Sequence, residues 1–222
     1  KLIDDQVGKL LSILRKRGML DNTLIVFTSD HGDMLGDHYL IQKGVPWRQA
    51  IMVPLAISLP GIAERGAIDA LVELTDVTAT ILDYAGLDPV AALSRPWPAY
   101  NNRIPSRSLL PVLRGKVRGV RDVVFSESDF TEERNGVYCS YTKEEYQQIR
   151  GKGRDTAWQM IQSATHKYVK YLNYDMPGAY HEELYNLTVD PDELRNVVDD
   201  PAEAAQLKLA RDRLMFVLDS YP

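Results

Sequence analysis

Hydrophobic residues recur at helical spacing at the start of the chain and then gather into short continuous runs. From Ile3 to Leu14 they keep the period of one helix face, and Gly18 is placed to end that helix. The apolar runs 23–29 and 51–59 have the length of strands and are bounded by turn-forming residues. The pattern therefore predicts one amphipathic helix followed by two strands.

A second helix is expected after these strands. It should run from about Asp76 to Ala85, with Thr75 as its N-cap and Gly86 just beyond its end. Strand and helix alternation of this kind predicts a parallel or mixed sheet covered by helices, which is the α/β class. Residues 88–118 are rich in proline, arginine and asparagine, and we expect them to form a long surface connection.

Beyond residue 118 the pattern changes to clustered short strands. The expected strands are 123–125, 158–162, 168–172 and 183–187, with a hairpin turn at 164–167 between the second and the third. A stripe of apolar residues predicts a terminal helix; its members are Leu207, Ala210, Leu214, Val217 and Tyr221. The chain is therefore expected to divide into an α/β part, residues 1–118, and a small antiparallel α+β subdomain, residues 119–222.

Composition and charge are those of an ordinary globular protein. The 222 residues are 45% hydrophobic and 26% charged, and the net charge of −5 argues against a nucleic-acid-binding surface. No apolar run approaches the roughly 18 residues that a bilayer-spanning helix needs. The single cysteine, Cys139, excludes an internal disulfide framework. The chain starts at Lys1 inside an amphipathic pattern, so we expect it to be a fragment that lacks any targeting segment.

The polar loop after the first predicted strand carries the candidate chemistry. Ser29-Asp30-His31-Gly32 directly follows the apolar run, and Gly36-Asp37-His38 and Lys43-Gly44 come next. Open α/β sheets bind ligands at this end of their strands. Aspartate supplies a hard oxygen, histidine a nitrogen lone pair and lysine a compact positive charge. This composition is typical of a site for a metal ion and an anion.

These segments resemble the second metal-binding segment of the sulfatase family, within the alkaline-phosphatase-like superfamily. The resemblance continues over nearly the whole chain, through 53–55, 74–86, 108–115 and the closing segment 183–196. It covers only the C-terminal portion of a sulfatase. The resemblance implies that residues 1–118 are part of an alkaline-phosphatase-like catalytic sheet covered by helices, and that residues 119–222 are the C-terminal subdomain.

The resemblance also implies roles for four residues. Asp30 and His31 would ligate a divalent metal, which is generally Ca²⁺ in the family, although a histidine ligand suits Mn²⁺ somewhat better. Lys43 would be the catalytic and substrate-binding lysine that contacts a non-bridging oxygen of the sulfate group. His38 would lie near the substrate, with packing or a hydrogen bond to a neighbouring loop as the equal alternative. After Lys43, Trp47 is expected either to contact the rest of the substrate or to cover the core.

Other parts of a sulfatase site have no match in this sequence. The family's nucleophile is a Cys or Ser in C/S-x-P-x-R that is oxidised to formylglycine, and Cys139 lacks both the Pro and the Arg. In the Pro105-Ser106-Arg107 segment, Arg103 stands at the nucleophile position. The Asp pair of the first metal segment is also missing, because Asp4-Asp5 lies in a helix before the wrong strand. We therefore expect this chain alone to be inactive.

Three functions stay open at this stage. The leading one is the C-terminal fragment of a metal-dependent sulfatase with a formylglycine nucleophile, acting on a sulfate ester such as a sulfated carbohydrate. A phosphonate or phosphate ester hydrolase of the same superfamily is the second, and a non-catalytic binding module that keeps the fold is the third. Substrate specificity is expected from the aromatic and charged loop 130–155. The resemblance makes a periplasmic or extracellular location an expectation, and the oligomeric state is not set by the sequence.

Overall fold

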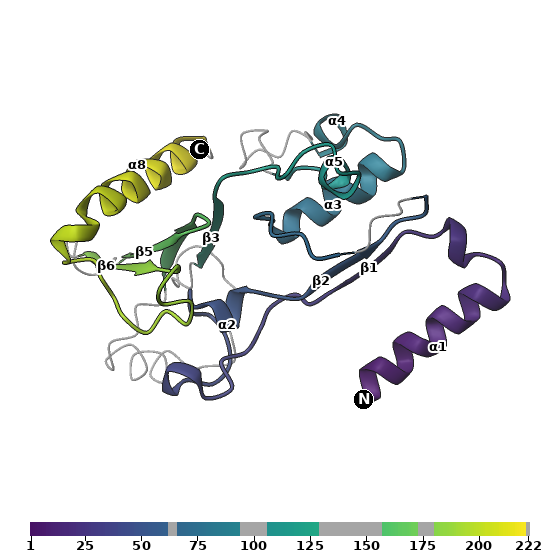
Figure 1. Ribbon diagram of the computed structural model, residues 1–222, viewed down its shortest axis with the longest axis horizontal. Coiled ribbons are helices and arrows are strands. Elements are labelled where there is room, and N and C mark those ends of the chain that lie inside the picture. The colour runs from purple at the N-terminus through teal and green to yellow at the C-terminus, as the bar shows by residue number, and fades with distance from the viewer. Residues whose placement is uncertain (62–65, 94–105, 129–156, 173–179, 221–222) are drawn as a thin grey trace, which may run out of the picture.

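The computed structural model of the chain describes residues 1–61, 66–93, 106–128, 157–172 and 180–220. The described elements form two regions, each built on its own antiparallel sheet (Figure 1). The first region holds a two-stranded sheet and the helices near it. The second holds a four-stranded sheet and the terminal helix.

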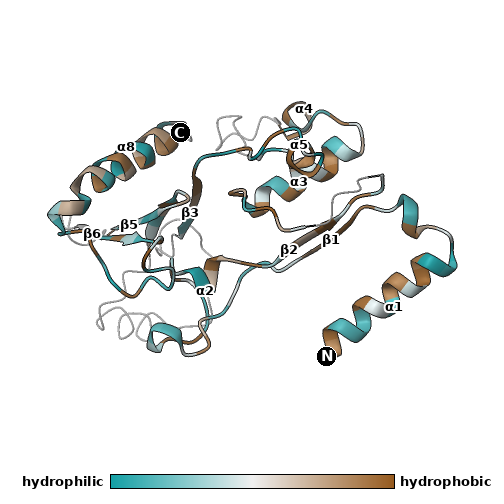
Figure 2. Cartoon of the chain, viewed as in Figure 1, coloured by the Kyte–Doolittle hydropathy of each residue, from teal (hydrophilic) through white to brown (hydrophobic). Residues whose placement is uncertain are grey.

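Helix α1 (Leu2–Lys16) confirms the first predicted helix. Acidic residues in its first turn and basic residues in its last turn match the helix dipole, and Gly18 takes a left-handed φ of 67° just beyond its end. No side chain of α1 is buried by the residues that the structure describes, and Ile3 and Leu10 remain 71% and 63% exposed. In Figure 2, α1 alternates between hydrophobic and hydrophilic colouring, whereas β1 and β2 are mostly hydrophobic.

Strands β1 (Ile25–Thr28) and β2 (Leu55–Ser58) confirm both expected strands, in shorter form. They pair antiparallel, with Ile25 opposite Ser58 and Thr28 opposite Leu55, which a mixed sheet allows but a purely parallel one does not. Parallel neighbours need a long crossover, usually a helix. Residues 29–54, all described, contain only the short helices η2 (Asp37–Tyr39) and α2 (Arg48–Ile51), so the chain returns beside β1 without crossing the sheet. The expected start of the second strand at residue 51 is wrong, because that residue ends α2.

Helix α3 (Leu74–Tyr84) confirms the predicted second helix, but Thr75 is not its N-cap. Glu73 caps it instead, in a capping box in which Glu73 and Asp76 each accept a hydrogen bond from the other's backbone N–H. Arg121 pairs with both carboxylates, and its Nη1 lies 2.6 Å from Glu73 Oε2. The backbone N–H of Phe125 also donates to Glu73 Oε1 at 2.9 Å. This buried node joins the start of α3 to the first strand of the second region.

The expectation that residues 88–118 form a long surface connection is partly wrong. Helices α4 (Pro89–Leu93) and α5 (Leu110–Leu113) lie within this range. Leu109, Leu110 and Val112 are buried, and the backbone N–H of Leu109 donates to Thr80 Oγ1 of α3 at 2.9 Å. Packing of this apolar run against α3 removes it from the surface. Residues 94–105 lie outside the described residues.

The second region confirms the four predicted strands, with shifted bounds, and the hairpin between the second and the third; its turn ends before His166, so the predicted turn at 164–167 is too long. Its sheet has the order β3-β4-β5-β6, all antiparallel; the strands are β3 (Val124–Ser128), β4 (Trp158–Gln162), β5 (His166–Leu172) and β6 (Tyr180–Asn186). After the 3-10 turn η3 (Pro201–Glu203), helix α8 (Ala204–Ser220) closes the chain. The division near residue 118 stays a prediction, with the described strands on its two sides in different sheets. The proposed specificity loop 130–155 lies outside the described residues.

Both faces of this sheet are covered. Successive strand residues point to opposite sides, so the strands contribute side chains to two separate clusters. One face packs against α8, where Ile161, Tyr168 and Leu184 meet Leu207 and Leu214 of the predicted apolar stripe. The opposite face carries a second cluster; its members are Trp158, Met160, Val169 and Tyr171, with Ile51 of α2 packed against them. The segment after β1 that carries the motifs, residues 29–51, therefore packs on the C-terminal sheet; we call it the motif segment. The terminal residue of the stripe, Tyr221, lies outside the described residues.

Within the described ranges, the structure contains no helix whose length and apolar character would let it span a bilayer.

Candidate functional site

The Ser29-Asp30-His31-Gly32 turn is fixed by a close backbone approach. The backbone N–H of Gly32 donates to the carbonyl oxygen of Ala50 at 2.8 Å. A Cβ atom at position 32 would lie 1.9 Å from the carbonyl oxygen of Gln49, so only glycine fits between the turn and α2. Ser29 Oγ donates to the carbonyl oxygen of His31 at 2.8 Å and ties the turn from the other side.

Asp30, His31 and Lys43 lie together beyond the end of β1. His31 Nδ1 is 2.7 Å from the carbonyl oxygen of Gly32, and a donated hydrogen bond there leaves the lone pair on Nε2. That Nε2 atom lies 2.5 Å from Lys43 Nζ and 3.5 Å from Asp30 Oδ2. The structure thus brings three of the four predicted site residues into contact. Their assigned roles stay predictions.

The electrostatics of this cluster favour an ionised Asp30. Desolvation, the largest single influence, raises the pKa of Asp30, but the combined effect of His31, two backbone hydrogen bonds and Lys43 lowers it below its ordinary value. One of these bonds comes from the backbone N–H of His31 at 3.0 Å. The Asp30 side chain is 84% exposed, so its carboxylate is accessible to an ion from solvent.

The donor chemistry of the cluster suits part of a metal site. A carboxylate oxygen and an imidazole nitrogen are ligands that divalent ions accept, and they approach each other at Asp30 and His31. The described part of the chain contains no group of three or more His, Cys, Asp or Glu side chains that could hold a metal ion. These two residues therefore fit as an incomplete ligand set.

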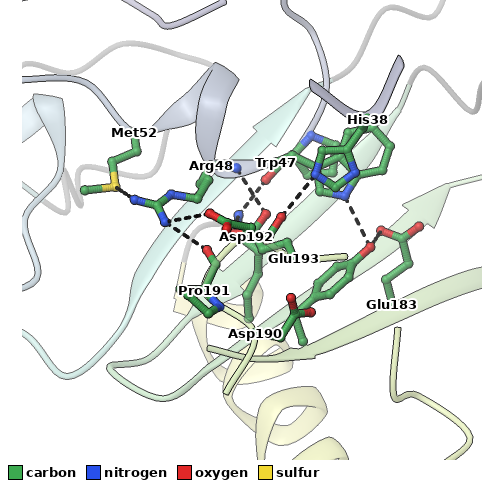
Figure 3. A network of polar contacts seen from close by, with 12 residues as sticks. His38, Trp47, Arg48, Met52, Glu183, Asp190, Pro191, Asp192 and Glu193 are labelled. Atoms are coloured by element: carbon green, nitrogen blue, oxygen red, sulfur yellow. Dashed lines mark hydrogen bonds and ion pairs between the residues drawn. The ribbon is translucent and has the colours of Figure 1, made fainter. Parts of the chain in front are cut away.

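His38 takes the alternative role of packing and hydrogen bonding to a neighbouring loop. Its ring stacks on Trp47, with the centroids 4.5 Å apart and the planes inclined by 12°. His38 Nε2 lies 3.2 Å from the carbonyl oxygen of Asp192 in the C-terminal region (Figure 3). A contact of His38 with substrate stays a prediction.

Trp47 links the loop after β1 to the C-terminal sheet, and the choice between the two roles that the sequence left open, contact with substrate or cover over the core, stays a prediction. Its Nε1 atom donates to the hydroxyl of Tyr185 on β6 at 3.2 Å, and that hydroxyl donates to Glu183 Oε2 at 2.9 Å. Burial raises the pKa of Tyr185, and the nearby Glu183 carboxylate also raises it against the opposing Trp47 bond. A neutral hydroxyl can therefore act as the link between the indole of Trp47 and Glu183 (Figure 3).

Arg48 connects the same segment to the turn after β6. Its Nη1 atom donates to the carbonyl oxygen of Pro191 at 2.9 Å and lies 3.4 Å from Asp192 Oδ1. Its backbone N–H donates to Glu193 Oε2 at 3.0 Å. Figure 3 shows the contacts of Arg48 with Pro191, Asp192 and Glu193.

Comparison with known proteins identifies the family. Residues 1–87 match the family model Sulfatase. An arylsulfatase of Clostridium perfringens is 31% identical over 201 residues, which are 89% of this chain and 34% of that protein. The chain belongs to the sulfatase family. The resemblance stated from its motifs is confirmed, and the chain spans about a third of the length of the curated relatives it matches.

Solved structures place this sulfatase-family chain in the alkaline-phosphatase-like fold. The phosphonate monoester hydrolase of Agrobacterium radiobacter matches with a TM-score of 0.76 and 30% identity, over 98% of this chain and 39% of that one. An enzyme solved in complex with its substrate, D-glucosamine-2-N,6-O-disulfate, matches with a TM-score of 0.73 and 24% identity, over 98% of this chain and 38% of that one. The family is one of sulfuric ester hydrolases, and the predicted fold class is confirmed.

Sequence reasoning missed a buried ion pair of this sulfatase-family chain, Lys167 with Glu193. Lys167 Nζ donates to Glu193 Oε1 at 2.6 Å, and the side chains are 0% and 2% exposed. Lys167 was expected in the hairpin turn, but β5 begins at His166, so the register turns the Lys167 side chain toward the motif segment. Burial lowers the pKa of Lys167 against the attraction of Glu193. The sequence held one indication of this pair, Glu193 itself, which lies in the closing segment 183–196 that resembles the sulfatase family.

Proposed function

We propose that the full-length protein containing this chain is a metal-dependent sulfatase that hydrolyses sulfate esters. The observation that carries this proposal is the contact of Asp30, His31 and Lys43 beyond the end of β1, in a chain of a family of sulfuric ester hydrolases. These residues bring a carboxylate, an imidazole and an ammonium group to one place. A sulfate ester is a tetrahedral anion, and such a set can bind it together with a divalent cation.

Asp30 and His31 would hold the divalent ion, with Ca²⁺ or Mn²⁺ as the candidates. When bound, the ion supplies charge stabilisation for the sulfate oxygens. The hydrogen bond between His31 Nδ1 and the carbonyl oxygen of Gly32 orients the ring, so Nε2 is the nitrogen presented to the site. The ligands that complete the set would come from residues outside this sequence.

Lys43 would bind a non-bridging oxygen of the sulfate group. Negative charge grows on the sulfate oxygens and on the leaving alcohol as the ester bond breaks, and a preplaced ammonium group stabilises that charge. Lys43 is exposed and its side chain is long, so it can turn from His31 toward a bound anion. This role makes Lys43 the one catalytic residue that we assign within the chain.

The nucleophile of the proposed reaction would also lie outside this sequence. We place a formylglycine hydrate there, whose oxygen would attack sulfur while the ester oxygen leaves as the alcohol. The proposal is supported by the lack of any C/S-x-P-x-R pattern in the 222 residues and by relatives about three times as long. The chain alone would therefore contain part of the active site and would not turn over substrate.

A phosphonate or phosphate ester hydrolase is the second candidate. It is favoured by the match to a phosphonate monoester hydrolase, whose TM-score of 0.76 and identity of 30% both exceed the values for the glucosamine-disulfate complex. Phosphonate monoesters are tetrahedral anions as well, so the same ammonium group and metal ligands suit them. The two candidates differ in the substrate and not in the placement of the three residues.

An assay of the full-length protein separates the candidates. We expect turnover of an aryl sulfate, a carbohydrate sulfate or choline sulfate to exceed turnover of a phenyl phosphonate monoester, with loss of activity on chelation and recovery with Ca²⁺ or Mn²⁺. Preference for the phosphonate would establish the second candidate. Turnover of none of these esters by the metal-loaded protein would refute both.

A further inference from the structure

The backbone just after Lys43 is held by a buried ion pair from the C-terminal region. Lys167 Nζ donates to the carbonyl oxygen of Pro46 at 2.8 Å and to Glu193 Oε1 at 2.6 Å. The other oxygen of Glu193, Oε2, accepts the backbone N–H of Arg48 at 3.0 Å. Pro46, Lys167, Glu193 and Arg48 therefore form a closed polar ring around three consecutive residues of the motif segment. We call the pair Lys167 and Glu193 the clamp.

The turn that carries Glu193 is built to present this carboxylate. Glu193 has a left-handed backbone with φ of 59°, which is uncommon for a residue other than glycine. The Asp190 carboxylate accepts the backbone N–H groups of Leu194 at 3.1 Å and Arg195 at 2.8 Å, and so holds the turn from within. The strained conformation at Glu193 is thus supported by its neighbours and directs the side chain to the ring.

The energetics of buried charge argue that the clamp does more than stabilise the fold. A buried ion pair loses hydration, and well-packed apolar residues of similar size often stabilise a protein as well or better. What apolar residues cannot supply is direction, because only hydrogen-bonding groups can hold a carbonyl oxygen and an amide at fixed positions. One carboxylate oxygen of Glu193 bonds Lys167, and the other accepts the backbone N–H of Arg48. Lys167 also donates to the backbone carbonyl oxygen of Pro46, so both members of the pair hold the backbone of residues 46–48.

The backbone that follows Lys43 is also held by the C-terminal sheet. Trp158 Nε1 donates to the carbonyl oxygen of Gly44 at 3.0 Å, and Pro46 is fully buried. The Lys43 side chain itself is exposed and contacts His31. Because the backbone from Gly44 onward is anchored and the side chain is not, the position from which Lys43 reaches the site depends on these anchors.

We propose that Glu193 and Lys167 are positioning residues that hold the backbone of residues 46–48 and so place Lys43 against the substrate anion. The consequence for catalysis rests on the function proposed above, whereas the holding of the backbone does not. Neither Glu193 nor Lys167 touches substrate in this proposal; both act through Lys43.

The first test measures backbone protection in the full-length protein. Glu193→Gln keeps the size of the side chain but replaces one acceptor oxygen with an NH₂ group, which must face either the ammonium of Lys167 or the N–H of Arg48. We expect hydrogen–deuterium exchange in peptides spanning 44–52 to speed up about tenfold. Glu203→Gln is the matched control, because Glu203 is a half-buried carboxylate of the same region that bonds His166 and Asn186 and not the motif segment. Its exchange in 44–52 should equal that of the wild type.

The second test is a double-mutant cycle with Lys43→Ala, using the best ester substrate of the full-length protein. Glu193→Gln should lower kcat about tenfold in the wild-type background and have almost no effect in the Lys43→Ala background, because residues that act through one another are not additive. A merely structural role would lower the rate of both backgrounds by the same factor. KM should change little if the lost contact is chiefly a transition-state one.

The outcomes distinguish the two proposals. Wild-type exchange rates at 44–52 in Glu193→Gln, or additive effects on kcat, would overturn the positioning role. If the wild type turns over no sulfate or phosphonate ester, the function fails while the exchange result still decides whether the clamp holds the backbone. If Glu193→Gln does not fold, the apolar pair Lys167→Met with Glu193→Leu takes its place, and it should retain folding, exchange faster at 44–52 and lose kcat.

Discussion

Gly32→Ala is the sharpest perturbation of the candidate site. The added methyl carbon would lie 1.9 Å from the carbonyl oxygen of Gln49 and 3.0 Å from its carbonyl carbon. Both are backbone atoms, so no side-chain rotation relieves the contact. Relief requires the motif turn to move away from α2, which also breaks the bond between the Gly32 N–H and the Ala50 carbonyl oxygen at 2.8 Å.

The magnitude follows from these two losses. Overpacking of this kind costs about 1–3 kcal/mol, and a lost backbone hydrogen bond costs about 1 kcal/mol. The turn therefore moves, and we expect Gly32→Ala to lower the free energy of unfolding by about 2–4 kcal/mol, the sum of the remaining strain and the lost hydrogen bond. His31 moves with the turn, so metal affinity and kcat should fall as well.

Urea unfolding and steady-state kinetics of the full-length protein together measure both outcomes. Gly8→Ala is the matched control, because it makes the same substitution in the middle of α1, where a Cβ meets nothing within 4 Å. Alanine there should stabilise the helix by about 0.5–1 kcal/mol, the opposite sign. A Gly32→Ala protein with the wild-type urea midpoint, metal affinity and kcat would refute the close-approach argument.

Three further predictions concern the site and the terminal helix. Lys43→Ala should keep the metal and lower kcat about a hundredfold through lost charge stabilisation, and wild-type turnover would show that the loop is wrongly assigned. Asp30→Ala should lose metal and activity together, measured by metal titration beside the rate; retention of full metal affinity would contradict its ligand role. Leu214→Asp should lower the free energy of unfolding by about 3–5 kcal/mol, because Leu214 is only 2% exposed. Met215→Asp, at a neighbour that is 51% exposed, is its control, and equal stabilities of the two variants would mean that the apolar stripe does not carry the packing of α8.

Local patterns in the sequence were enough to predict the elements whose causes are local. The apolar period of α1 and α8, and the short runs that become β4 and β5, lie within single segments, so their periodicity is visible in the sequence. The motif loop was found from its residue types and its resemblance to the sulfatase family, because Asp30, His31 and Lys43 follow a strand within a short stretch of chain. Their contact needs only the end of β1, the Gly32 approach and a loop that folds back.

Features that depend on distant partners were decided only by the tertiary structure. Glu73 caps α3 because Arg121 and Phe125, which lie about fifty residues further along the chain, bond its carboxylate. The antiparallel pairing of β1 with β2 depends on a connection that lacks a crossover helix.

The packing role of His38 and the clamp of Lys167 and Glu193 depend on the seating of the motif segment on the C-terminal sheet. A lysine in a predicted turn and a glutamate in a polar segment both look solvated in the sequence. They become a buried pair because two segments more than a hundred residues from the motif close over it. In the part of the chain that the structure describes, the two charged groups bond each other and the backbone of residues 46–48.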